Sequence, residues 1–133
     1  MIAASDLRVG NWVYDGEHTQ FPMFIRAIGE DYVYLDFDGN EGDLWESTPD
    51  DVKGIPLTEE LLEKIGFTYN GVWWRKQDAE YAVDVSVAMA YVQIEKWANG
   101  STHSRCTCHG MRFVHELQNL FRVITKQELE VML

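Results

Sequence analysis

The sequence has little cysteine, little proline and no long apolar run. Two cysteines and three prolines in 133 residues exclude a disulfide framework and a collagen-like chain. The apolar runs are far shorter than the roughly 20 residues that a membrane-spanning helix needs. The first ten residues contain Asp6 and Arg8 and lack the apolar core of a signal peptide. With 46% hydrophobic and 25% charged residues, we expect a soluble globular protein of the cytoplasm with reduced thiols.

Positive charge is scarce in the first half of the chain. Residues 1–60 hold 14 acidic and 3 basic residues, whereas residues 61–133 hold 8 of each. Nine acidic residues and no Lys or Arg lie between Glu30 and Asp51, which disfavours direct binding to nucleic-acid phosphates. Two interpretations remain: a solvated acidic surface that maintains solubility, or an acidic face that docks a basic protein partner, for example by imitating DNA.

The first half, residues 1–56, is predicted to form a small acidic β-barrel. Short β-like runs alternate with turn residues such as Asp15-Gly16 and Asp38-Gly39-Asn40. A Src-homology-like or KOW-type barrel is favoured because closing a small sheet removes its exposed edges. The expected strands are residues 11–14, 21–28, 32–37, 44–47 and 52–55.

The second half, residues 57–133, is predicted to be an α+β unit. Leucine spacing predicts a helix over residues 58–65 with Thr58 as its N-cap, and an apolar stripe predicts another beginning at Val114. Thr125 and Glu128 form a capping-box pattern that predicts a short final helix. The expected elements between and after these are strands 72–76, 80–87, 91–97 and 105–113, a loop at 98–104 and the final helix at 126–132. We expect the two halves to pack as one compact body, because each alone has a marginal core.

Two sets of residues are the candidate partner-binding positions. The first is the acidic turn after the third predicted strand, and it comprises Asp36, Asp38, Glu41 and Asp43. The second is the polar face of the last long helix, where helical spacing places His115, Gln118, Asn119 and Arg122 together. Solvation of that face is the alternative. The acidic turn does not match an EF-hand, because Glu41 stands where glycine is needed and Ser47 where the final glutamate is needed.

Cys106, Cys108, His103 and His109 lie within seven residues and are the candidate metal ligands. Structural zinc sites usually pair two such clusters, and a second cluster is lacking here. On a strand, Cys106 and Cys108 would share one face while His109 points to the other. The sequence therefore predicts no metal or other cofactor, although a metal- or thiol-dependent activity at this loop is the alternative function.

No phosphate-binding loop, dinucleotide fingerprint or nucleophile elbow occurs in the sequence. The case for an enzyme is therefore thin, and we expect a non-enzymatic binding module.

Three segments resemble a family of small uncharacterised proteins encoded by gut bacteria, often within prophages and other mobile elements. They are residues 6–13 (DLRVGNWV), 55–67 (IPLTEELLEKIGF) and 112–129 (RFVHELQNLFRVITKQEL). Phe113, Glu116 and Lys126 stand where the family commonly has tyrosine, glutamine and glycine. The insert at 98–109 has no counterpart. The resemblance implies no activity or cofactor, but it favours His115, Gln118 and Asn119 as a shared polar surface.

Overall fold

The structure is a computed structural model that describes residue 2 and residues 4–98 and 101–133. The chain divides into two compact units, Met1–Ile55 with Leu133 and Pro56–Met132. No helix in the described part of the chain is long and apolar enough to cross a membrane.

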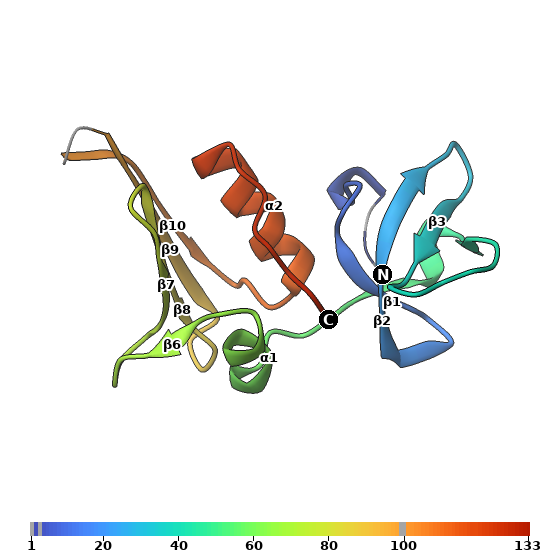
Figure 1. Cartoon of the computed structure of the whole chain (residues 1–133), viewed down its shortest axis with the longest axis horizontal. Helices are drawn as coiled ribbons and strands as arrows, with labels where there is room; N and C mark the ends of the chain where they lie inside the picture. The colour runs from blue at the N-terminus through green and yellow to red at the C-terminus, as the bar shows by residue number, and fades with distance from the viewer. Residues whose placement is uncertain (1, 3, 99–100) are drawn as a thin grey trace. The chain divides into compact units, whose positions relative to one another are not determined.

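The first unit is one antiparallel sheet of five strands (Figure 1). The strand order is β4-β3-β2-β1-β5. Two short 3-10 helices accompany the strands: Ala4–Asp6 precedes the first strand, and Pro49–Asp51 lies between the fourth and the fifth. The strands are β1 (Trp12–Asp15), β2 (His18–Ile28), β3 (Val33–Asp36), β4 (Trp45–Ser47) and β5 (Val52–Gly54).

Alternating apolar residues build the core of this unit. Val13, Ile25 and Leu35 come from three neighbouring strands and have no exposed surface. Side chains two positions apart on a strand point to the same face, so each strand contributes its apolar set to one cluster. Leu7, Met23, Val33 and Val52 complete the buried cluster.

The predicted closed barrel is wrong, and the sheet is instead a curled half-barrel. Strands β4 and β5 stand at opposite ends of the strand order and do not pair with each other. The register between β1 and β2 shifts at Tyr14/Asp15, and one extra residue between Ile25 and Ala27 forms a β-bulge opposite β3. A bulge bends a strand and increases its twist. Closure requires the two edges to pair as well. A Src-homology-like barrel is therefore excluded, whereas the α+β class of the whole chain is confirmed.

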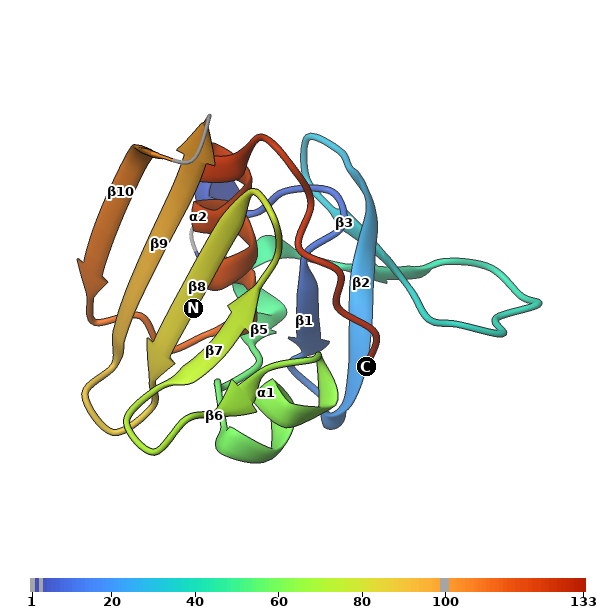
Figure 2. The same cartoon turned by 60° about the vertical axis from the view of Figure 1, so that its left-hand side comes forward.

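The second unit is a five-stranded antiparallel sheet with two helices (Figure 2). The strand order is β10-β9-β8-β7-β6, and α2 lies along one face of the sheet (Figure 1). The elements are α1 (Glu59–Lys64), β6 (Thr68–Tyr69), β7 (Trp74–Gln77), β8 (Tyr81–Ser86), β9 (Tyr91–Ala98), β10 (Ser101–His109) and α2 (Val114–Thr125).

The face of the sheet that α2 covers is apolar, and we call it the inner face. Val83 on β8 and Ile94 on β9 are cross-strand partners, and both are fully buried. Tyr81 meets Phe121 of α2 edge to face, with ring centroids 4.8 Å apart. Lys96 also belongs to this face, and its Nζ donates to the carbonyl of Thr125 at 3.1 Å.

The predicted helix at 58–65 is confirmed, because α1 occupies most of it. The Thr58 hydroxyl accepts a hydrogen bond from the Leu61 N–H at 3.1 Å, as expected of an N-cap. Gly66 follows with φ +100°, a conformation that favours glycine at a helix end.

Two predicted elements near the C-terminus are wrong, and a third is confirmed only in part. Part of the expected loop at 98–104 is strand, since β10 begins at Ser101 and Ser101 pairs with Ala98. The expected strand at 105–113 ends at His109. Residues 126–132 are not helical. The Thr125 hydroxyl donates to the carbonyl of Phe121 at 2.7 Å and accepts from the Gln127 N–H at 3.2 Å, so it completes the end of α2 rather than starting another helix.

Candidate functional site

The acidic turn of the sequence forms the connection between β3 and β4, residues 37–44, which we call the acidic loop. Figure 2 shows the chain after β3 projecting away from the rest of its sheet. Asp38, Glu41 and Asp43 are all exposed on this loop. In the described part of the chain, none of these three carboxylates pairs with a basic side chain. The loop therefore presents unneutralised negative charge to solvent.

Asp36, the fourth acidic residue of the predicted set, lies at the end of β3 and anchors the start of the loop. Its residue is only 9% exposed. Its Oδ2 accepts hydrogen bonds from Arg26 Nη2 at 2.7 Å and from Arg26 Nε at 3.1 Å. Its Oδ1 accepts from the Phe37 N–H and from Asn40 Nδ2, both at 2.9 Å. Both carboxylate oxygens are thus occupied within the unit, so Asp36 positions the loop and does not contact solvent as its neighbours do.

Asn40 links Asp36 to the rest of the loop through hydrogen bonds of its side chain. Besides donating to Asp36, its Nδ2 donates to the carbonyl of Asp43 at 3.3 Å. Its Oδ1 accepts from the Gly42 N–H at 2.9 Å. Gly39 has φ +84°, so the reversal of the chain uses a conformation that side chains disfavour. These bonds order the backbone of the loop.

The hydrogen bonds also keep Asp36 ionised. The bond from Asn40, followed by the bonds from Arg26, lowers the pKa of the Asp36 carboxyl below its ordinary 3.8. Arg26 is itself held in place, because its guanidinium carbon lies 5.0 Å from the centre of the Phe24 ring. Arg26 therefore neutralises Asp36 alone, and the negative charge of the exposed carboxylates remains.

Two large apolar side chains follow the acidic residues. Leu44 is 39% exposed and Trp45 is 41% exposed, and Glu46 beside them is exposed too. Apolar anchors surrounded by polar groups are typical of protein interfaces. The sequence analysis missed Leu44, Trp45 and Asn40. Their signal was position alone, directly within or after a run of acids.

The predicted polar face of α2 is not a single solvated face. His115 and Gln118 are each only 3% exposed, Asn119 is half-buried and Arg122 is exposed. The His115 ring stacks on Phe113, with centroids 5.9 Å apart. Arg122 pairs with Glu128 at 3.4 Å and donates to the carbonyl of Lys126. The four residues that helical spacing grouped therefore differ in burial, and they do not form one exposed polar surface.

The cysteine and histidine residues of β10 diverge as strand geometry requires. Cys106 and Cys108 are the partners of Ile94 and Val92 and share the inner face. His109 lies on the opposite face, where its ring meets Tyr91 at 4.8 Å. The side chain of His103 lies outside the described residues. Among the described residues, no group of three or more His, Cys, Asp or Glu is placed to hold a metal ion.

No protein-family model, curated protein or solved structure matches this chain.

Proposed function

We propose that the protein is a non-enzymatic binding module of mobile-element origin, acting in the cytoplasm, whose acidic loop docks a basic protein segment. The observation that supports this proposal is the order of the loop. Hydrogen bonds of the Asn40 side chain to Asp36, to the Gly42 N–H and to the Asp43 carbonyl order the backbone of the loop that carries Asp38, Glu41 and Asp43. A loop that is ordered in advance loses less conformational entropy on binding.

The charge and the apolar neighbours favour a protein over a nucleic acid. Exposed carboxylates attract Lys and Arg side chains and repel phosphates. Leu44 and Trp45, at 39% and 41% exposure, offer apolar area that a purely electrostatic contact would not need. The favoured partner therefore combines basic and apolar residues in one segment.

The test uses the full chain and a fluorescent peptide rich in lysine and leucine. Asp38→Asn, Glu41→Gln and Asp43→Asn are introduced together to remove the charge of the loop while keeping its size. We expect peptide binding, followed by fluorescence anisotropy, to weaken by at least about tenfold, since charge-assisted contacts are lost. The binding affinity of the variant for the peptide should also depend less on salt concentration than that of the parent.

A matched control removes the same charge elsewhere in the first unit. Glu30→Gln, Asp31→Asn and Asp50→Asn replace three exposed acids outside the acidic loop. We expect this variant to bind the peptide nearly as the parent does. Equal weakening in both variants would mean that the net charge alone attracts the peptide, and the proposed docking by the loop would be wrong.

A further inference from the structure

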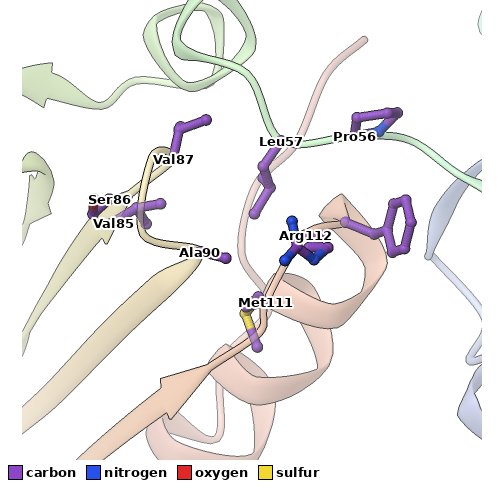
Figure 3. Close-up of a pocket in the computed structure, with 9 residues that line it drawn as sticks. Pro56, Leu57, Val85, Ser86, Val87, Ala90, Met111 and Arg112 are labelled. Atoms are coloured by element: carbon purple, nitrogen blue, oxygen red, sulfur yellow. The ribbon is translucent and has the colours of Figure 1, made fainter.

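The second unit contains a cavity of about 260 Å³ at one end of its sheet (Figure 3). Three segments that are distant in sequence form its wall. They are the chain before α1, the turn between β8 and β9, and the chain between β10 and α2. The residues that line the cavity include Leu57, Val85, Val87, Ala90, Met111 and Arg112.

Backbone hydrogen bonds hold these segments together. The Leu57 N–H donates to the carbonyl of Arg112 at 2.8 Å, and the Met111 N–H donates to the carbonyl of Ala90 at 3.0 Å. Pro56 forms an antiparallel bridge with Phe113 beside them. The cavity is thus bounded by paired backbone rather than by side chains alone, and its shape is set by the fold.

Ala90 takes a costly backbone conformation at the cavity wall. Its φ is +50°, a left-handed value that is unfavourable for a residue with a Cβ atom. Its side chain is nevertheless buried, at 7% exposure. Strained residues cluster at binding sites, where the surrounding structure maintains them. The strained turn at Ala90 is therefore consistent with a binding site at this cavity.

The side chains that line the cavity are apolar except for Ser86 and Arg112, and Arg112 is the one cation among them. Leu57, Val85 and Met111 are buried at 8%, 1% and 7% exposure. Arg112 is exposed, and its guanidinium has no ion-pair partner in the described part of the chain. Glu116, its near neighbour, uses Oε1 to accept from the backbone N–H groups of Arg112 and Phe113 at 3.2 and 3.1 Å.

Charge and size together define the ligand. An unpaired guanidinium is best matched by a carboxylate, which can accept two of its N–H groups. Residues 61–133 carry equal numbers of acids and bases, so this half of the chain does not repel an anion as the first half would. A volume of about 260 Å³ lies just below the range of pockets that hold drug-sized ligands, so it suits a small organic acid rather than a large cofactor.

We propose that this cavity binds a small monocarboxylate with a compact apolar body. The carboxylate lies at Arg112, and the apolar body lies against Leu57, Val85 and Met111. The acidic loop belongs to the other unit, so the proposal does not depend on the docking function.

The test titrates the full chain with benzoate and hexanoate, each beside its neutral amide, and follows backbone N–H resonances by NMR. We expect saturable binding of a carboxylate, with shifts at Leu57, Ala90 and Met111. The amide should bind at least about tenfold more weakly, as expected when a hydrogen bond to a charged group is lost. If neither carboxylate saturates, or if the amides bind equally well, the proposal is wrong.

Two variants separate the cavity from general charge effects. Arg112→Gln should weaken carboxylate binding by at least about tenfold and leave amide binding unchanged. Arg105→Gln is the control, because Arg105 pairs with Glu95 at 2.6 Å and lies outside the cavity. We expect this variant to bind the carboxylate with the affinity of the parent protein. The spectrum of each variant reports whether it is folded. Unchanged affinity in a folded Arg112→Gln protein would overturn the role of the guanidinium.

Discussion

At the scale of single residues, Asp36 was expected to contact a partner, but in the structure its carboxylate is hydrogen-bonded within its own unit. The sequence places it in a row of acids, with nothing to distinguish it from Asp38. In the structure it is 9% exposed and accepts hydrogen bonds from Arg26, Phe37 and Asn40. Its function is to order the loop that exposes its neighbours.

The first prediction concerns the pH dependence of that order. Because the folded-state pKa of Asp36 lies below 3.8, the unfolded chain binds more protons than the folded chain between those two values. The free energy of unfolding contributed by Asp36 therefore rises with pH across this window and is fully present above it. It is lost as the pH falls through the folded-state pKa.

Two measurements check this prediction. The Asp36 carboxyl carbon, followed by NMR, should titrate below 3.8. Asp36→Asn should remove this part of the acid dependence of stability and disorder the loop at neutral pH. A titration at or above 3.8, or an Asn variant with an equally ordered loop, would contradict the anchoring role.

At the scale of elements, helix ends explain both a success and a failure of the sequence analysis. The N-cap of α1 was predictable because Thr58 and Leu61 are three residues apart. The capping box at Thr125 was misleading because the same hydroxyl bonds back to Phe121. A threonine hydroxyl can accept a backbone N–H bond at the start of a helix, as Thr58 does, or donate to a carbonyl in the last turn, as Thr125 does. The path of the chain beyond the threonine determines which role it takes.

The second prediction concerns the residue that terminates α2. Lys126 has φ +63° in the left-handed region, where glycine carries no penalty from a Cβ atom. We expect Lys126→Gly to raise the free energy of unfolding by about 1 kcal/mol, measured by urea denaturation. The backbone carbonyl that accepts from Arg122 is retained in the variant.

A second lysine provides the matched control. Lys64 lies in the last turn of α1, in an ordinary helical conformation. Lys64→Gly should lower the free energy of unfolding by about 1 kcal/mol. The two substitutions are chemically identical and are expected to act with opposite sign. If both destabilise the protein to the same extent, the left-handed conformation of Lys126 is not costly.

At the scale of the whole molecule, charge is divided between the two units. Residues 1–60 have 14 acids against 3 bases, and the acidic loop concentrates part of that surplus. In the second unit, the sheet face opposite α2 compensates its own charges. Arg75 lies 3.6 Å from Asp84, and Arg105 lies 2.6 Å from Glu95. The surplus of negative charge therefore lies in the first half of the chain.

The third prediction follows from the uncompensated charge. Like charges on the first unit repel each other in the compact state and destabilise it. Raising NaCl from about 10 mM to about 150 mM shortens the Debye length from about 30 Å to about 8 Å, so Tm should rise. Thermal denaturation at several salt concentrations measures this change.

The same variants that test docking serve as controls for this salt effect. Neutralising Asp38, Glu41 and Asp43 should reduce the rise in Tm with NaCl, and so should neutralising Glu30, Asp31 and Asp50. A salt dependence that is unchanged in both variants would show that repulsion among these acids does not limit stability.

By itself, the sequence determined what depends on neighbouring residues. It placed α1 and most strands, and it separated Cys106 and Cys108 from His109, because helix and strand periodicities repeat within a few residues. It also determined the acidic first half, which is a matter of counting.

Only the tertiary structure decided what depends on distant residues. It kept the edge strands β4 and β5 from pairing with each other, paired Asp36 with Arg26, and extended β10 over part of an expected loop. It also brought Leu57 to Arg112 across more than fifty residues. Local patterns do not specify such contacts, because each depends on where the intervening chain runs and on which polar groups burial forces to pair.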